Sequence, residues 1–190
     1  MEKSEIRKKI LEQRESIDSD IRSKWDESIF KRLITSELYK RANTIFTFVS
    51  FKSEVDTHMI INDAISNHKT ICVPKINSKQ EGIKLYKIDS FNQLKKGYFG
   101  ILEPIESCQQ VDKNSLDLIL MPGVAFDRYG GRVGYGAAFY DRFISNMNKH
   151  VDKIALAYHF QVLDSVPMNE HDIRIDGIIT EKENISTAFK

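Results

Sequence analysis

The most distinctive chemistry of this chain lies in a glycine-rich stretch at residues 121–141, called the glycine segment below. Five of the nine glycines fall between positions 123 and 136, and Arg132 lies among them. A stretch with few side chains lets backbone N–H groups approach an anion, and an arginine adds positive charge for a phosphate or carboxylate. The glycine segment therefore indicates an anion site, although a tight connection between a strand and a helix is an equally simple explanation.

Two familiar phosphate-binding motifs are absent from the glycine segment. No Gly-Lys-Ser/Thr follows the glycines, so the segment is not a P-loop. Gly134-x-Gly136 is followed by Phe139, where the dinucleotide-binding fingerprint needs a third glycine. The sequence motif thus belongs to neither of these nucleotide-binding classes.

Other residues that could do chemistry also have ordinary explanations. Lys3 and Arg7 are four positions apart and share a helix face, where solvated charges are common. Glu54 lies in a loop after a predicted strand and could be a plain loop carboxylate. Asp141, in the first turn of a predicted helix, could complement the helix dipole or hold Mg2+ beside a phosphate. Asp172 lies in a polar loop before the last predicted strand.

The elements that must position these residues alternate between helical and strand patterns. Hydrophobic periodicity predicts helices over residues 2–16, 19–40, 56–67 and 137–148, and strands over residues 44–50, 70–74, 83–88, 118–121, 154–158 and 177–180. This alternation predicts an α/β fold: a three-layer single domain over residues 1–190, with a mostly parallel, Rossmann-like sheet and helices on both faces. The antiparallel strand at 83–88 is expected at an edge. Ligands bind such sheets beyond the carboxyl ends of the strands.

Composition excludes several classes of protein. The 28 basic and 27 acidic residues give a net charge of +1, which argues against a basic nucleic-acid coat. The two cysteines lack the spacing of a zinc site. No signal-peptide pattern and no apolar run of the ~20 residues that a membrane span needs are visible. We therefore expect a soluble, cytoplasmic protein with no nucleic-acid or membrane partner.

The order of residues in the glycine segment resembles the signature of a known family. Pro-Gly-Val-Ala-Phe-Asp is followed by Gly-x-Arg-x-Gly-x-Gly, an aromatic pair and an aspartate, which is similar to the 5-formyltetrahydrofolate cyclo-ligase family. The resemblance extends over nearly the whole chain and includes Lys3-x-x-x-Arg7, residues 50–57 and residues 167–176. It implies a ligase that uses ATP and Mg2+ to cyclise 5-formyltetrahydrofolate to 5,10-methenyltetrahydrofolate, releasing ADP and phosphate.

The resemblance also implies roles for the residues at matching positions. ATP binding would involve Lys3, Arg7, Arg132, Val133, Gly134, Tyr135, Gly136, Ala137, Ala138, Phe139 and Tyr140. Substrate binding would involve Arg7, Val49, Glu54, Tyr135, Gly136 and Phe139. Arg132 and Tyr135 are expected to be catalytic, and Asp141 and Asp172 to bind Mg2+. We expect a monomer whose partners are the small-molecule folate and ATP.

The chain departs from the family pattern at residues 137–139, where most members carry Gly or Lys, then Gly, then Tyr. A left-handed backbone at Ala138 would cost ~1–2 kcal/mol, whereas a helical one would be harmless. The departure leaves open a nucleotide- or folate-binding protein without catalysis. A sugar-phosphate isomerase would need a base–acid pair that the sequence does not offer. A protein–protein module would leave the glycine segment without a role.

Overall fold

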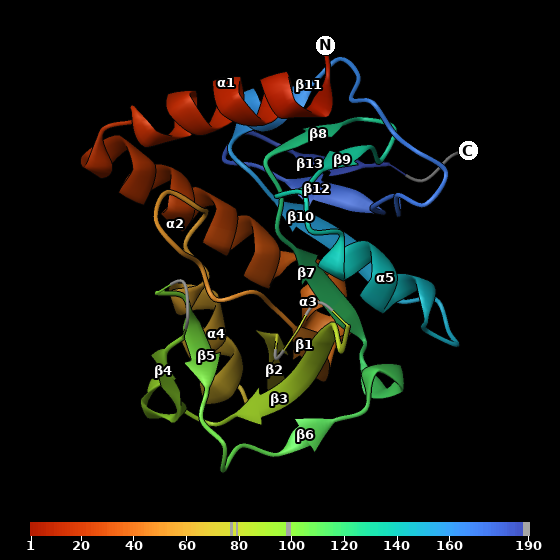
Figure 1. The fold of residues 1–190 in the computed structure, drawn as a ribbon. Helices are drawn as coiled ribbons and strands as arrows, with labels where there is room; N and C mark the ends of the chain where they lie inside the picture. The colour runs from red at the N-terminus through yellow and green to blue at the C-terminus, as the bar shows by residue number, and fades with distance from the viewer. Residues whose placement is uncertain (77, 79, 98–99, 188–190) are drawn as a thin grey trace.

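A mostly parallel β-sheet runs through the middle of the molecule in the computed structural model (Figure 1), which describes residues 1–76, 78, 80–97 and 100–187. Its strand order is β13-β12-β10-β7-β1-β2-β3-β6. The strands are β1 (Thr44–Phe46), β2 (Thr70–Ile76), β3 (Ile83–Ile88), β6 (Gln110–Val111), β7 (Leu118–Met121), β10 (Asp152–Leu156), β12 (Gly177–Ile179) and β13 (Asn184–Ser186). The five strands from β12 to β2 are parallel, and β13, β3 and β6 pair antiparallel at the two ends.

Helices cover both faces of this sheet, as the sequence predicts. The helices are α1 (Lys3–Glu15), α2 (Ser19–Thr35), α3 (Glu37–Arg41), α4 (His58–Ser66) and α5 (Phe139–Ser145). In Figure 1, α2 and α4 lie on one side of the sheet and α5 on the other. Side chains of a strand alternate between these layers: Ile45 packs in the core with α2 and α4, and the next residue, Phe46, packs against Phe143 of α5. The fold is therefore three-layered.

Two smaller sheets complete the structure. One joins β8 (Ala125–Asp127) with β9 (Arg132–Val133) and β11 (Val162–Leu163), and the other pairs β4 (Leu94–Lys96) with β5 (Leu102–Pro104). Single 3-10 turns lie at Phe91–Gln93, Lys113–Ser115 and His159–Gln161. No helix among the described residues is both long and apolar enough to span a bilayer.

Local chemistry explains where several elements begin and end. The Asp18 side chain accepts hydrogen bonds from the N–H groups of Asp20 and Ile21, which caps α2. The helix predicted over 19–40 is divided in two, because Ser36 has an extended backbone and its side chain caps α3. β2 continues past Pro74, since β1 pairs with β2 only as far as Cys72 and leaves that side of the strand free.

Other predicted bounds need correction. The strand at residues 83–88 has the predicted bounds and is antiparallel, but it is not an edge, because β6 pairs outside it. The strand predicted over residues 44–50 ends at Phe46, where the chain enters a loop. The helix predicted over residues 137–148 is limited to Phe139–Ser145. The glycine segment contains the β8–β9 hairpin, which the sequence did not predict.

Candidate active site

The candidate site lies at the carboxyl-terminal edge of the parallel strands. Three segments meet there: residues 47–57 after β1, residues 122–138 after β7, and residues 166–173 of the segment that leads to β12. Helix α1 packs across β8 and β9 (Figure 1), burying Ile6 and Ile10 against Ala125 and Val133. The first helix of the chain therefore covers the loops that the sequence predicts as ligand-binding.

A hairpin gives the glycine segment its shape. The Asp127 Oδ1 accepts the N–H groups of Tyr129 and Gly131 at 2.9 and 2.8 Å, and its Oδ2 accepts the N–H of Val166 at 2.9 Å. Gly130 has a φ of +84°, and a Cβ there would lie 2.6 Å from the Ile175 carbonyl oxygen. Gly130 and Gly131 thus serve the turn of the hairpin. Gly134, which is half-buried, and Gly136, which is exposed, lie beyond that turn.

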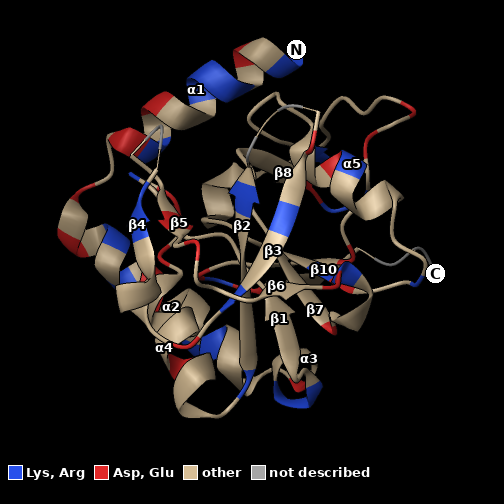
Figure 2. Cartoon of the chain, turned by 60° about the horizontal axis from the view of Figure 1, so that its bottom comes forward, with Lys and Arg blue, Asp and Glu red and all other residues tan. Residues whose placement is uncertain are grey.

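Basic side chains on one face of α1 reach down to these loops. Lys3 forms an ion pair with Asp172. The Arg7 Nε donates to the Gly134 carbonyl oxygen at 2.6 Å. The charges of α1 also show in Figure 2, where basic and acidic parts alternate along the helix. Arg7 therefore lies against the backbone of the glycine segment, whereas Lys3 pairs with Asp172, which is outside that segment.

Glu54 and Tyr135 form the polar centre of the site. The Tyr135 hydroxyl donates to the Glu54 Oε1 at 2.5 Å, and the Phe51 N–H donates to the Oε2 at 2.9 Å. Burial raises the pKa of Glu54, while these two hydrogen bonds and the positive charge of Arg14 oppose that rise. Burial and the nearby Glu54 also raise the pKa of the Tyr135 phenol, so it stays a hydrogen-bond donor at neutral pH. The pair offers a carboxylate whose remaining lone pairs can accept N–H groups.

A buried ion pair lies beneath the loop. The Arg132 Nη2 is 2.8 Å from both carboxylate oxygens of Asp141, and the two side chains are 5% and 12% exposed. A Cβ at Gly134 would lie 2.9 Å from the Arg132 Nη1, so the loop backbone passes directly over the guanidinium. The Arg132 Nε is buried without a hydrogen-bond partner among the described residues. Arg132 thus adds positive charge under the loop while it holds Asp141.

Asp141 and Asp172 share one corner of the site. The Ile173 N–H donates to the Asp141 Oδ1 at 3.0 Å, and the Asn169 N–H donates to the Asp172 Oδ2 at 2.6 Å. Although burial opposes it, the pKa of Asp172 lies below its usual range because of the Asn169 N–H and Lys3. Two hard carboxylates fit Mg2+, which proteins commonly hold through one or two carboxylates, water and substrate phosphates. Each carboxylate already has a basic partner, so a metal ion would compete with Arg132 and Lys3.

Comparisons with known proteins decide the family. The sequence profile of the 5-formyltetrahydrofolate cyclo-ligase family matches residues 1–181. The chain belongs to the 5-formyltetrahydrofolate cyclo-ligase family. A probable 5-formyltetrahydrofolate cyclo-ligase of Caenorhabditis elegans is 30% identical over 96% of this chain and 94% of its own length. The 5-formyltetrahydrofolate cyclo-ligase of Escherichia coli is 26% identical over 90% of this chain and 96% of its own length.

A solved structure agrees with this assignment. The 5,10-methenyltetrahydrofolate synthetase of Aquifex aeolicus superposes on this chain with a TM-score of 0.88. The two chains are 32% identical, and the match covers 100% of this chain and 95% of that one.

The remaining residues expected from the cyclo-ligase family differ in their surroundings. Val49 and Val133 are buried in the hydrophobic core, and Tyr140 stacks on Phe46 with a centroid distance of 5.5 Å. These three side chains pack in this structure, and their roles as ligand contacts stay predictions. Phe139 is the first residue of α5. The Arg142 guanidinium lies over its ring, with the Cζ 5.0 Å from the ring centroid.

Positions 136–138 bring the backbone into α5. Gly136 has a φ of +104°, and a Cβ there would lie 3.7 Å from the Arg7 Cζ. The Ala137 carbonyl oxygen accepts the Arg142 Nη1–H at 2.9 Å. Ala138 is the N-cap of α5 with φ 52° and ψ 24°, in the left-handed region. The cyclo-ligase pattern has glycine here, and the backbone of this chain keeps the conformation that glycine favours.

Two residues of the site were missed by sequence reasoning. Arg14 lies two turns beyond Arg7 on α1, and its Nη2 donates to the Tyr135 hydroxyl at 3.0 Å. The Arg14 Nε donates to the Ser53 Oγ at 3.1 Å. A signal was available in the spacing, since positions i and i+7 share a helix face. Nothing in the local sequence marks Ser53.

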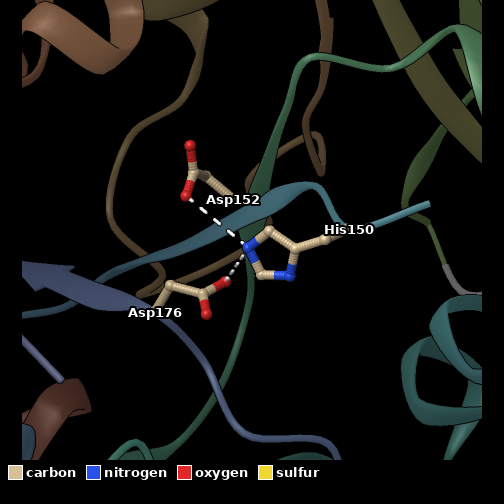
Figure 3. Close-up of side chains that lie close together, drawn as sticks. All are labelled: His150, Asp152 and Asp176. Carbon is tan, nitrogen blue, oxygen red and sulfur yellow. Dashed lines mark ion pairs between the residues drawn. The ribbon is translucent and has the colours of Figure 1, made fainter. Parts of the chain in front are cut away.

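A second cluster lies at the opposite edge of the sheet, where the parallel strands begin. The His150 Nε2 is 3.8 Å from the Asp152 Oδ1 and 4.0 Å from the Asp176 Oδ2 (Figure 3). Arg41 pairs with Asp152 at 2.6 Å and Lys153 with Asp176 at 2.5 Å. His150, Asp152 and Asp176 therefore belong to an ion-pair network with Arg41 and Lys153 in this structure.

Proposed function

We propose that this chain is an ATP-dependent cyclo-ligase that converts 5-formyltetrahydrofolate to 5,10-methenyltetrahydrofolate. The γ-phosphoryl group of ATP passes to the formyl oxygen, which releases ADP and makes that oxygen a good leaving group. N10 then attacks the activated carbon and loses its proton, and the C–O bond breaks to release phosphate. The observation that carries this proposal is the match of the family profile to residues 1–181.

The geometry of the site supports the proposal. Glu54 would accept N–H groups of the pterin, with Tyr135 beside it. Arg7 holds the Gly134 carbonyl, and its guanidinium lies next to Gly136, where phosphate oxygens could approach both the charge and the loop. Arg132 contributes positive charge from below the loop. Such a site works mainly by aligning the γ-phosphate with the formyl oxygen and stabilising the developing charge.

Asp141 and Asp172 are the residues that would hold Mg2+ in this proposal. A magnesium ion bound with ATP would neutralise charge on the phosphates. A metal ion at this pair would displace Lys3 from Asp172, which would free Lys3 for the nucleotide, and would compete with Arg132 for the Asp141 carboxylate. A single cyclo-ligase domain over residues 1–190, a monomeric state and a cytoplasmic location stay predictions from the sequence.

An absorbance assay tests the proposal. Purified protein is mixed with 5-formyltetrahydrofolate, ATP and Mg2+, and the longer-wavelength band of the conjugated methenyl product is followed. We expect a band that requires both ATP and Mg2+, with ATP-free and EDTA samples as controls. Folded protein that gives no band contradicts the proposal.

The left-handed Ala138 favours one alternative, a protein that binds nucleotide or folate but has lost turnover. In that case calorimetry would detect binding of ATP or 5-formyltetrahydrofolate, and long incubation would give no product. Replacement of Ala138 by glycine would then be expected to restore the methenyl band.

A further inference from the structure

Arg14 is a buried arginine whose charge has no ion-pair partner among the described residues. It is 4% exposed and lies near the end of α1. Its guanidinium forms two hydrogen bonds to neutral hydroxyls, those of Ser53 and Tyr135. Burying a full positive charge is unfavourable unless another group compensates for it. The geometry around Arg14 therefore points to a function beyond packing.

The partner that compensates this charge lies one hydrogen bond further away. The Arg14 Nη2 donates to the Tyr135 hydroxyl at 3.0 Å, and that hydroxyl donates to the Glu54 Oε1 at 2.5 Å. The Arg14 guanidinium also lies over the Tyr135 ring, 5.9 Å from its centroid. Arg14 and Glu54 line one small cavity with apolar walls that include Phe48 and Leu156. Arginine, phenol and carboxylate thus form one chain of hydrogen bonds at a cavity.

We infer that Arg14 is a positioning residue of the folate site: it holds the Tyr135 hydroxyl against Glu54 and so fixes the direction of the free carboxylate lone pairs. This inference rests on the proposed function. Among the described residues, three titratable or charged side chains act on Glu54 or are acted on by it: Arg14 from α1, Tyr135 from the glycine segment, and Tyr140 from α5. Of these, only Arg14 brings a positive charge. Burial raises the pKa of Glu54, and the positive charge of Arg14 opposes that rise together with the hydrogen bonds from Tyr135 and Phe51.

Two substitutions at Arg14 separate its charge from its shape. Arg14→Met removes the charge and keeps the length, whereas Arg14→Lys keeps the charge and loses the planar fork that reaches both hydroxyls. We expect Arg14→Met to raise the KM for 5-formyltetrahydrofolate about tenfold, as for loss of a charge-assisted hydrogen bond. The KM for ATP should stay within about twofold, since the phosphate-facing residues are untouched. Arg41→Met is the matched control, because Arg41 is exposed and lies at the opposite edge of the sheet.

The pH profile gives a signature that a merely structural role would not produce. In Arg14→Met, the acid limb of kcat/KM for the folate should move to higher pH, since Glu54 loses a nearby positive charge. In Arg14→Lys, the limb should stay near its wild-type position while KM still rises. A limb that does not move in Arg14→Met overturns the inference.

A double-mutant cycle with Tyr135→Phe tests whether Arg14 acts through Tyr135. We expect Arg14→Met to change the folate KM far less in the Tyr135→Phe background than in the wild type. Equal effects in both backgrounds, or parallel increases in the KM values for folate and ATP, overturn the inference. Wild-type protein without turnover would instead contradict the proposed function itself, and the inference with it.

Discussion

Replacing Ala138 by glycine should stabilise this protein. Ala138 has a φ of 52° and a ψ of 24°, a conformation that costs an alanine about 1–2 kcal/mol. The residue is exposed, so loss of its methyl group removes little buried surface. Glycine gains about 0.4–1 kcal/mol of chain entropy in the unfolded state, which opposes the gain. The net effect is an increase of about 1 kcal/mol in the free energy of unfolding.

Equilibrium unfolding in urea, with thermal unfolding beside it, measures this effect. An increase of about 1 kcal/mol corresponds to a rise of about 2–4 °C in Tm for a chain of this size. Ala137→Gly is the matched control, because Ala137 is exposed in the same loop and is not among the described residues with positive φ. That control should lose stability by about 0.4–1 kcal/mol. An Ala138→Gly variant no more stable than Ala137→Gly would refute the strain argument.

Three further substitutions follow from the described contacts. Burial, with the nearby charge of Asp56, raises the pKa of Asp26 to about 6. The folded state therefore binds this proton more tightly than the unfolded state does, and the free energy of unfolding should fall as pH rises from about 4 to 6. Asp26→Asn should flatten that part of the curve of unfolding free energy against pH. Asp141→Asn should destabilise the protein by about 3 kcal/mol in urea unfolding, since it leaves the buried Arg132 without its counterion. Gly130→Ala should lower Tm by several degrees, because Gly130 has a φ of +84° and the new Cβ would lie 2.6 Å from the Ile175 carbonyl oxygen. An unchanged Tm would show that the hairpin relaxes around the new methyl group.

The parts of the fold that depend on local patterns could be predicted from the sequence. The alternating strand at residues 83–88 and the apolar strand at 118–121 have the predicted bounds. Helix α2 begins at Ser19, where the predicted helix begins. The break at Ser36 was not predicted because the apolar pattern continues through it. The hairpin at residues 125–133 was not predicted because its pairing depends on Asp127 and on contacts with residues far along the chain.

The site was predicted in part, for a similar reason. The spacing of Lys3 and Arg7 and the glycine segment are local signals. The structure places Arg7 against the glycine segment and pairs Lys3 with Asp172. The ion pair between Arg132 and Asp141 was not predicted, because a helix position and a strand position nine residues apart meet only once the loop folds. Arg14 was not predicted either. One of its partners, Tyr135, is more than a hundred positions away, and the other, Ser53, lies in a loop with no motif.

The contacts of α1 also set the order in which the site can form. Lys3 meets Asp172 across 169 positions, and Arg7 meets Gly134 across 127 positions. Contacts this distant carry the largest loop-closure entropy and form late in folding. During synthesis α1 leaves the ribosome before its partners, so its contacts can form only after the chain as far as Asp172 has emerged. Ligand binding at the site therefore requires that α1 has docked on residues far along the chain, so only the folded protein can bind.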